Sequence, residues 1–205
     1  MIVLGIDPGL SGGLAIVEVA EARRLLFAGD IPTTGEAAKA RVYVGEVLRI
    51  FQKYKPTHAL IERAQAMPDQ GASSGFNYGR AVGAIEACAQ GMMIPLTIIE
   101  SSAWKKFHGL IKPSDVDGKA WSKIVKENSR QRAIMLYPGA GFFPNKGHHN
   151  RAEAALIADY GASLLSGAAP QRGEKPKLKV VAGTKPDQLD LLAQRTHLQY
   201  LSEPE

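Results

Sequence analysis

The chain has 205 residues, of which 45% are hydrophobic and 22% charged, and its formal net charge is +5 at pH 7, which fits one ordinary globular domain with room for a tail. A single cysteine, Cys88, excludes an internal disulfide and a zinc site built from cysteines, and it fits a reducing cytoplasm. Met1 leads directly into an apolar run and no apolar stretch reaches the length of a membrane span, so we expect neither a signal peptide nor a membrane partner.

Apolar runs bounded by glycine and proline predict three strands at the start of the chain, and helices alternate with short β-rich runs after them. The predicted strands are residues 2–6, 13–19, 25–31, 57–62 and 95–100. The predicted helices are residues 37–54, 73–91, 118–136 and 149–165. This order indicates an α/β domain with a mixed central sheet over residues 1–166.

The composition changes at Gly167. Residues 167–205 interleave prolines and glycines with lysines and arginines, which is typical of an extended basic tail. Within it, residues 189–200 are compatible with a short terminal helix.

Two predicted strands end in an acidic residue. Asp7 follows the first apolar run and precedes a glycine-rich turn, where a metal or phosphate can approach the backbone. Glu62 follows the buried run 59–61, and glutamate is a poor strand residue. Asp7 alone is equally well interpreted as a turn cap, and Glu62 as a partner of Arg63. Two strands with the same ending favour a functional interpretation.

A third acid lies in the predicted helix 149–165. Glu153 precedes an alanine- and leucine-rich run that should press the helix against the sheet, so its carboxylate is expected to be partly buried. Helical spacing places His149 and Asn150 on the same face as Glu153. Asp159, six positions further on, is expected at the surface or as a cap.

Three carboxylates brought together repel one another, and divalent cations relieve this repulsion. Hard oxygen ligands suit Mg²⁺, with Mn²⁺ able to substitute. Two such ions could activate water and stabilise both oxygens of a phosphodiester displacement, so no side chain need act as nucleophile. The sequence contains no convincing Ser/His/Asp set.

The segment between Trp104 and Arg132 carries eight basic residues against three acidic ones. Such a local excess is what binding to backbone phosphates requires, although each lysine alone is better interpreted as part of a solvated helix face. Trp104 itself is interpreted as a core residue.

Three motifs, in order, resemble those of the RuvC-type Holliday junction resolvases, most closely the phage-borne and alphaproteobacterial branch. They are Gly-Ile-Asp-Pro-Gly at 5–9, Leu-Ile-Glu at 60–62 and Arg-Ala-Glu-Ala-Ala-Leu-Ile-Ala at 151–158. Residues 101–110 and 129–138 look like the connecting segments of that group. The resemblance covers about residues 2–166, and the ordered set is far more specific than any one motif.

The resemblance implies an RNase H-like fold, with a mixed five-stranded sheet flanked by helices, and a homodimer. It also implies metal-dependent, symmetric nicking of two strands at a four-way DNA junction, in the cytoplasm of a bacterial or phage-infected cell and without a nucleotide cofactor. Asp7, Glu62 and Glu153 match the metal-binding acids of the motifs. The fourth acid of the family is replaced here by Asn150, whose carbonyl could still be a ligand, and His149 is the alternative ligand or proton carrier.

The helix predicted at 73–91 has glycines at 75, 79 and 83, and we interpret Gly79 and Gly83 as sites of close helix–sheet packing. In the family this helix lies near the dimer interface, and the resemblance implies that its first residues contact or stack on DNA bases. The predicted DNA-contacting residues are Arg63, Phe76, Asn77, Tyr78, Arg80, Lys105, Lys106, Lys112, Lys119 and Lys123.

Three other functions stay open from the sequence. The same site would serve a broader nuclease that debranches forks and flaps. Asn150 makes a non-catalytic junction-binding protein conceivable. An Asp-x-Gly turn also opens the sugar-kinase and actin-like ATPase fold, but the chain lacks a second phosphate loop and the usual length of those proteins.

Overall fold

The computed structural model describes residues 1–36, 39–65, 71–112 and 117–167, without the side chains of 119, 120, 122 and 123. Five strands form one mixed sheet in the spatial order β3–β2–β1–β6–β7, with β1–β2 and β2–β3 antiparallel and β1–β6 and β6–β7 parallel. These strands are β1 (Ile2–Asp7), β2 (Gly13–Val19), β3 (Arg23–Asp30), β6 (His58–Glu62) and β7 (Leu96–Ile99). The predicted α/β class and five-stranded mixed sheet are therefore confirmed. The predicted tail lies, from residue 168, outside the described residues.

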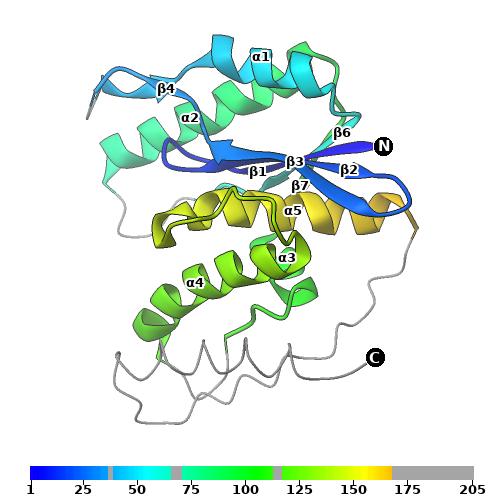
Figure 1. Ribbon diagram of the computed structural model, residues 1–205. Helices are drawn as coiled ribbons and strands as arrows, with labels where there is room; N and C mark the ends of the chain where they lie inside the picture. The colour runs from blue at the N-terminus through cyan, green and yellow to red at the C-terminus, as the bar shows by residue number, and fades with distance from the viewer. Residues whose placement is uncertain (37–38, 66–70, 113–116, 168–205) are drawn as a thin grey trace, which may run out of the picture.

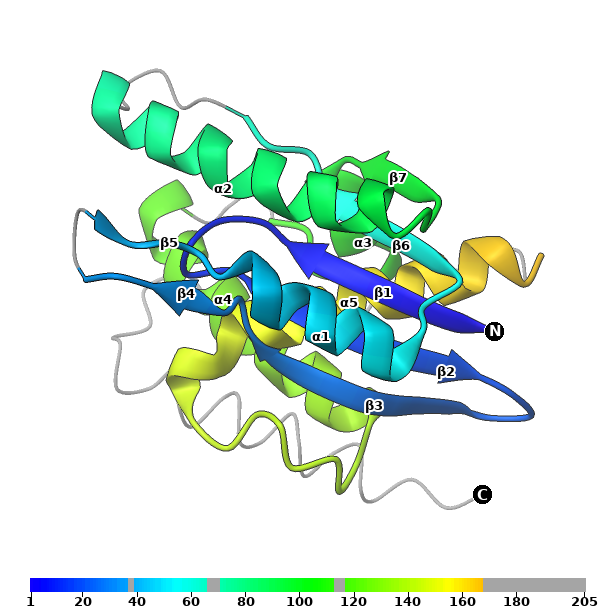
Figure 2. The same ribbon diagram turned by 90° about the horizontal axis from the view of Figure 1, so that it is seen from above.

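Helices cover both faces of the sheet (Figure 1). One face carries α1 and α2, which lie side by side above the strands (Figure 2), and the other carries α5, with α3 and α4 packed beyond it. The helices are α1 (Val44–Tyr54), α2 (Ala72–Gly91), α3 (Ser101–Phe107), α4 (Gly118–Leu136), the 3-10 turn η2 (Lys146–His148) and α5 (His149–Leu165). Among the described residues, no helix combines the length and the apolar character that crossing a membrane requires.

The alternation of side chains along β1 and β6 divides the core into two layers. Leu4 and Ile6 of β1 pack on the side of α1 and α2, whereas Val3 packs on the side of α5. Because successive strand residues face opposite sides, Asp7 falls on the α5 side. The same alternation in β6, where Leu60 packs toward α5, places Glu62 on that side too. Both strand-terminal acids therefore face the helix that carries Glu153.

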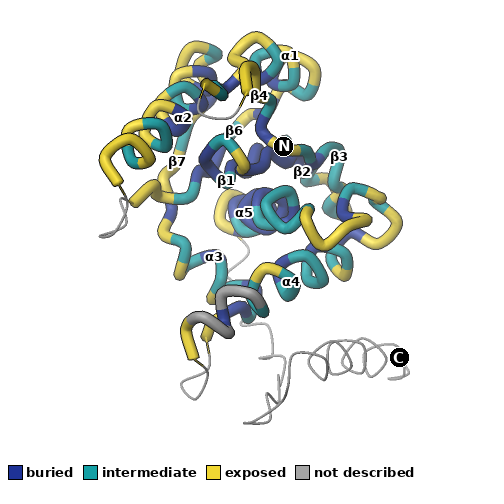
Figure 3. The backbone as a smooth tube through the Cα atoms, turned by 90° about the vertical axis from the view of Figure 1, so that its left-hand side faces the viewer, coloured by how far each residue is buried: buried dark blue, intermediate teal, exposed yellow. Residues whose placement is uncertain are grey.

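Helix α5 lies unusually close to the sheet. A Cβ atom at Gly5 would lie 2.5 Å from the Ala158 amide nitrogen and closer still to the Ala154 carbonyl oxygen. At Gly13 it would lie 2.7 Å from the carbonyl carbon of Asn150. Glycine is thus required where α5 crosses β1 and β2, and the small alanines of α5 complete the contact. Figure 3 shows α5 as the most continuously buried helix, between the sheet and α4.

The segment before α1 differs from its prediction. The helix expected over 37–54 begins only at Val44, because a two-residue ladder precedes it between β4 (Thr33–Thr34) and β5 (Arg41–Val42). The Tyr43 amide then donates to the Pro32 carbonyl, which ties the start of α1 to the end of this ladder. Residues 37 and 38 lie outside the described part of the chain. The short helix α3 had no counterpart among the predicted elements.

The prediction of a surface position for Asp159 is wrong. Its side chain is buried, and Oδ1 accepts hydrogen bonds from the Tyr137 hydroxyl at 2.8 Å and from Arg23 Nη1 at 3.0 Å. Helix α5 packs against the sheet on one side and against α4 on the other, so a residue turned away from Glu153 is still buried. The ion pair and the hydroxyl stabilise the charge that this burial would otherwise penalise.

The prediction that Gly79 and Gly83 pack against the sheet is also wrong. Both are exposed, and a Cβ atom at either position would meet no described atom within 4 Å. Helix α2 contacts the rest of the molecule through its opposite side, where Ala81, Val82 and Ile85 are buried. The glycine-bearing face of α2 therefore remains open in the single chain.

Candidate active site

Asp7, Glu62 and Glu153 lie at the same end of the sheet, close enough for their charges to interact. Asp7 and Glu62 each follow the last paired residues of the parallel strands β1 and β6, Ile6 and Ile61, so the two acids are neighbours at the same end of adjacent strands. Glu153 approaches from the first turn and a half of α5, whose N-terminus is tied to β3 by two hydrogen bonds of 2.7 Å from Arg151 to Asp30. The two strand ends and the start of α5 therefore lie at the same end of the sheet, and the sharing of a cation by their three carboxylates stays a prediction.

The electrostatics of Asp7 reflect this proximity. Burial raises the pKa of the Asp7 carboxyl well above its ordinary value, and the Glu153 and Glu62 carboxylates raise it further, whereas Lys105 and Lys126 lower it. Burial likewise raises the pKa of Glu153, with Lys105 opposing this effect and Glu62 adding to it. A carboxylate cluster of this kind is destabilised by its own repulsion, which a bound cation would relieve.

Two neutral donors hold two of the carboxylates. The indole nitrogen of Trp104 donates to Glu62 Oε2 at 2.7 Å, and the Ser129 hydroxyl donates to Glu153 Oε1 at 3.1 Å. The Ser129 hydroxyl also contacts the Val125 carbonyl at 2.8 Å, one turn back in α4. Neither Trp104 nor Ser129 was predicted to belong to the site. Trp104 is buried, as expected, but its polar edge serves the site.

The donor set fits a hard divalent cation in its chemistry, since all three acids offer oxygen ligands. As the side chains stand in the described residues, however, no group of three or more His, Cys, Asp and Glu side chains is arranged so that it could hold an ion. The acids are close enough to interact through their charges but do not form a closed cage.

Asn150 and His149 have partners outside the three acids. The Asn150 side-chain amide donates to the Ser11 carbonyl in the turn between β1 and β2. Burial and then Lys126 lower the pKa of His149, and a hydrogen bond with the Lys146 backbone raises it. The role of either residue as a fourth metal ligand stays a prediction.

Of the predicted DNA-contacting residues in α2, Tyr78 lies near the three acids. Tyr78 packs against Gly9, and burial, followed by the charges of Asp7 and Glu62, raises the pKa of its hydroxyl. Phe76 is 67% exposed, with the Arg80 guanidinium 5.5 Å from its ring centre. Asn77 is partly buried on the same turn of α2.

The predicted basic residues are less uniform. Arg63 is half-exposed and forms an ion pair with Glu100, so one interpretation left open for Glu62, pairing with Arg63, is not what the structure has. Lys105 is partly buried with its ammonium 5.0 Å from the Trp104 ring centre, whereas Lys106 and Lys112 are exposed. The side chains of Lys119 and Lys123 lie outside the described residues. Lys126, which was part of the basic segment but not singled out, acts on both Asp7 and Glu153.

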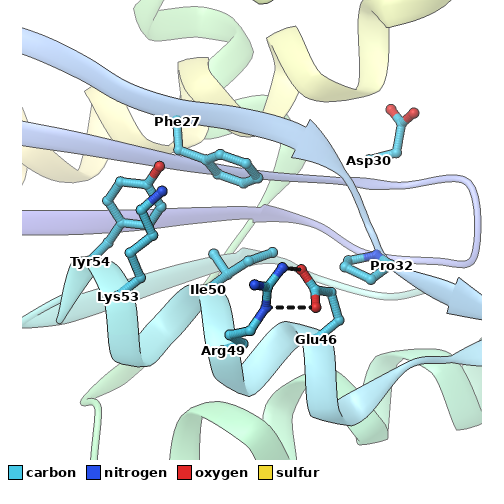
Figure 4. A pocket seen from close by; sticks show the side chains of 8 residues that line it. All are labelled: Phe27, Asp30, Pro32, Glu46, Arg49, Ile50, Lys53 and Tyr54. Carbon is cyan, nitrogen blue, oxygen red and sulfur yellow. Dashed lines mark hydrogen bonds and ion pairs between the residues drawn. The ribbon is translucent and has the colours of Figure 1, made fainter.

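A hollow of about 300 Å³ lies elsewhere, between β3 and α1 (Figure 4). It is lined by Phe27, Asp30, Pro32, Glu46, Arg49, Ile50, Lys53 and Tyr54. Its charged groups already have partners in the chain: Arg49 donates to Glu46 at 2.6 and 2.8 Å, Asp30 is bound by Arg151, and Lys53 lies 4.9 Å from the Tyr54 ring centre. None of the three converging acids lines it, so it is not the candidate active site.

The fold is similar to solved junction resolvases. RuvC of T. thermophilus in complex with a Holliday junction substrate has a TM-score of 0.58 and 21% identity, with 82% of this chain and 97% of that chain covered. A second structure of Thermus thermophilus RuvC has a TM-score of 0.56, 23% identity and the same coverage. The yeast mitochondrial Holliday junction resolvase Ydc2 has a TM-score of 0.45 and 13% identity, over 80% of this chain and 82% of that chain. No protein-family model and no curated protein matches the sequence.

The architecture therefore places the chain among the RNase H-like α/β folds. Within that class it has the fold of the RuvC-type Holliday junction resolvases, as the resemblance of its motifs implied. The narrower assignment to the phage-borne and alphaproteobacterial branch stays a prediction.

Proposed function

We propose that this chain is a metal-dependent endonuclease that resolves four-way DNA junctions by paired, symmetric nicks. The proposal is supported above all by the proximity of Asp7, Glu62 and Glu153, which come from β1, β6 and α5. They are close enough for the charges of Glu62 and Glu153 to raise the pKa of Asp7. The likeness in fold to a RuvC in complex with a Holliday junction substrate supports four-way junctions as the substrate.

In this mechanism the three carboxylates would hold the cation, and the hydrogen bonds from Trp104 and Ser129 restrict the rotation of the Glu62 and Glu153 side chains. When bound, one or two Mg²⁺ or Mn²⁺ ions would supply Lewis-acid stabilisation of the phosphodiester and a more acidic water. Lys105 and Lys126 reduce the repulsion among the carboxylates and attract the phosphate backbone. Tyr78 would provide a ring surface near the acids, and the exposed Phe76, two residues earlier in α2, a second ring on which an unpaired base could stack.

A nicking assay tests this function. Labelled four-way, three-way, flap and linear DNA of the same sequence is incubated with the protein in Mg²⁺ and then in Mn²⁺. We expect paired nicks in the four-way junction, a rate at least about tenfold lower on linear DNA, and none with EDTA. Equal cleavage of flaps and forks would favour the broader debranching nuclease. Tight binding without nicking in either metal would favour the non-catalytic junction-binding protein. The hydrogen bond from the Asn150 side chain to the Ser11 carbonyl supports this alternative, because it engages the residue at the position of the family's fourth acid.

We further propose that the functional unit is a homodimer that pairs through the open face of α2. On this face Gly75, Gly79 and Gly83 would each place a Cβ atom in open space, which would allow a second helix to approach closely. Ile98 of the edge strand β7, a strand that contacts α2, is 49% exposed. Two nicks related by symmetry require two copies of the site.

Substituting Gly83→Leu is expected to weaken dimerisation by about tenfold or more. Each copy would carry one added leucine side chain at the place where the backbones of the two α2 helices approach each other. Sedimentation equilibrium over a range of concentrations measures the dissociation constant. Gln52→Leu, which adds the same side chain at an exposed position of α1, is the matched control and should leave it unchanged. Identical dissociation constants for wild type and Gly83→Leu would contradict an interface at this face.

A further inference from the structure

Trp104 combines complete burial with a polar bond to the candidate active site. Its side chain is 0% exposed, yet its indole nitrogen donates to Glu62 Oε2 at 2.7 Å. The bond links neighbouring elements, because β7 pairs with β6 through Glu62 and Ile99, and α3, which carries Trp104, begins directly after β7. A second tie at the same place is the Arg63 amide, which donates to the Ile99 carbonyl at 2.8 Å.

An indole is suited to fixing a carboxylate. It has a single donor and no acceptor, and a buried donor of this kind needs a partner. A hydrogen bond to an ionised acceptor is stronger than one between neutral groups. The ring of Trp104 packs in the core layer between the sheet and α5, so its N–H direction is set by packing. Glu62 itself is only partly buried, at the end of its strand, and gains its orientation from this donor.

The face of the same ring lies next to a cation of the site. The Lys105 ammonium lies 5.0 Å from the centre of the Trp104 ring, within the range of a cation–π contact. Lys105 also opposes the effect of burial on both Asp7 and Glu153. The indole N–H of Trp104 therefore orients Glu62. The face of its ring positions the Lys105 ammonium, whose charge opposes the effect of burial on Asp7 and Glu153.

We propose that Trp104 is a positioning residue of the metal site, holding the Glu62 carboxylate and Lys105 in the arrangement that receives the cation. This inference rests on the proposed function. It predicts that cation binding shifts the NMR resonance of the Trp104 indole N–H. A tryptophan with a packing role alone would show no such shift. It also predicts that removing the N–H, while keeping an aromatic ring, weakens the response to metal.

The chain has two tryptophans, which makes a matched comparison possible. Trp121 is also buried, at 8% exposure, and lies in α4 outside the contacts described for the three acids. Trp121→Phe leaves one indole N–H resonance, that of Trp104, and Trp104→Phe leaves that of Trp121. Each variant is titrated with MgCl₂ while these resonances are recorded, and its nicking of a four-way junction is measured over the same Mg²⁺ range.

In Trp121→Phe we expect the Trp104 resonance to shift and saturate, and the shift to disappear when Asp7→Asn is added. In Trp104→Phe the Trp121 resonance should not move. The Mg²⁺ concentration for half-maximal nicking should rise about 10- to 100-fold in Trp104→Phe and stay unchanged in Trp121→Phe. Junction affinity without metal should be the same in both.

The outcomes separate the two proposals. If the wild type neither nicks nor shows a metal-dependent shift, the proposed function fails, and the role of Trp104 fails with it. If the wild type nicks but Trp104→Phe and Trp121→Phe respond to Mg²⁺ alike, the role of Trp104 is overturned and the proposed function stands. If Trp104→Phe does not fold, the titration of Trp121→Phe decides: a saturating shift supports the inference, and an unmoved resonance overturns it.

Discussion

Substitution of Glu153 by glutamine is expected to lower the rate of junction nicking by about 10³-fold, because loss of one charged ligand removes several kcal/mol of metal-assisted stabilisation. Junction affinity should stay within a few-fold of wild type, since the change spares the phosphate contacts. The same result is expected for Glu62→Gln and Asp7→Asn. A gel assay on a labelled four-way junction, with binding measured in EDTA, provides both quantities.

The thermal stability of Glu153→Gln should change in the opposite direction to its activity. Burial and neighbouring negative charge raise the pKa values of Asp7 and Glu153, so these carboxylates destabilise the metal-free protein when ionised. Removing one charge should therefore keep or raise the midpoint of thermal unfolding in EDTA. Adding Mg²⁺ should raise the midpoint of the wild type but not that of the variant.

Glu18→Gln is the matched control, because Glu18 lies at the other end of the sheet, opposite Ile2, in an exposed pair with Arg24. It should retain wild-type nicking and the wild-type response to Mg²⁺. Full nicking by Glu153→Gln would remove this residue from the site. A loss of nicking accompanied by an equal loss of folded protein would assign Glu153 a structural role.

The positions of the three acids could be predicted because local patterns determine them. An acid that ends an apolar strand emerges at the edge of the sheet, and the two-residue alternation in β1 and β6 sends both acids to the same side. The alanine-rich run after Glu153 predicted a helix pressed against the sheet. In the structure this packing appears as close contacts between the backbone of α5 and the strands at Gly5 and Gly13.

The errors arise where the environment of a helix depends on distant parts of the chain. Asp159 was expected at the surface because it faces away from Glu153, but α4 covers that side of α5 and brings Tyr137 to it. The glycines of α2 resemble a packing motif, yet which face of α2 meets the molecule is set by its apolar residues. Spacing alone does not distinguish a buried small-residue face from an open one.

Trp104 and Ser129 could not be assigned to the site because their partners are remote in sequence. The bond from Trp104 spans 42 positions and that from Ser129 spans 24, and neither residue type signals a carboxylate partner. The burial of Trp104 was predictable from its apolar bulk. The direction of its N–H depends on how α3 follows β7, which local sequence does not determine.

Gly5→Ala is expected to be the most damaging single-atom change in the described core. The added methyl would lie 2.5 Å from the Ala158 amide nitrogen and closer to the Ala154 carbonyl, and both are backbone atoms of a helix that cannot turn aside as a side chain can. Helix α5 must shift away from β1, at a cost of about 3 kcal/mol or more. For a chain of this size that lowers the midpoint of thermal unfolding by roughly 6 °C or more, which calorimetry measures.

The same shift separates Glu153 from Asp7, so the protein that remains folded should also nick more slowly and bind Mg²⁺ more weakly. Gly91→Ala is the control, since a Cβ atom there meets nothing within 4 Å at the end of α2, and it should be neutral or slightly stabilising. Gly161→Ala should be intermediate, because its new methyl meets the side chain of Leu60, which can move. Equal stability of Gly5→Ala and Gly91→Ala would mean that α5 does not lie against β1 as described. In that case the packing of α5 on β1 would not be what brings Glu153 close to Asp7 and Glu62.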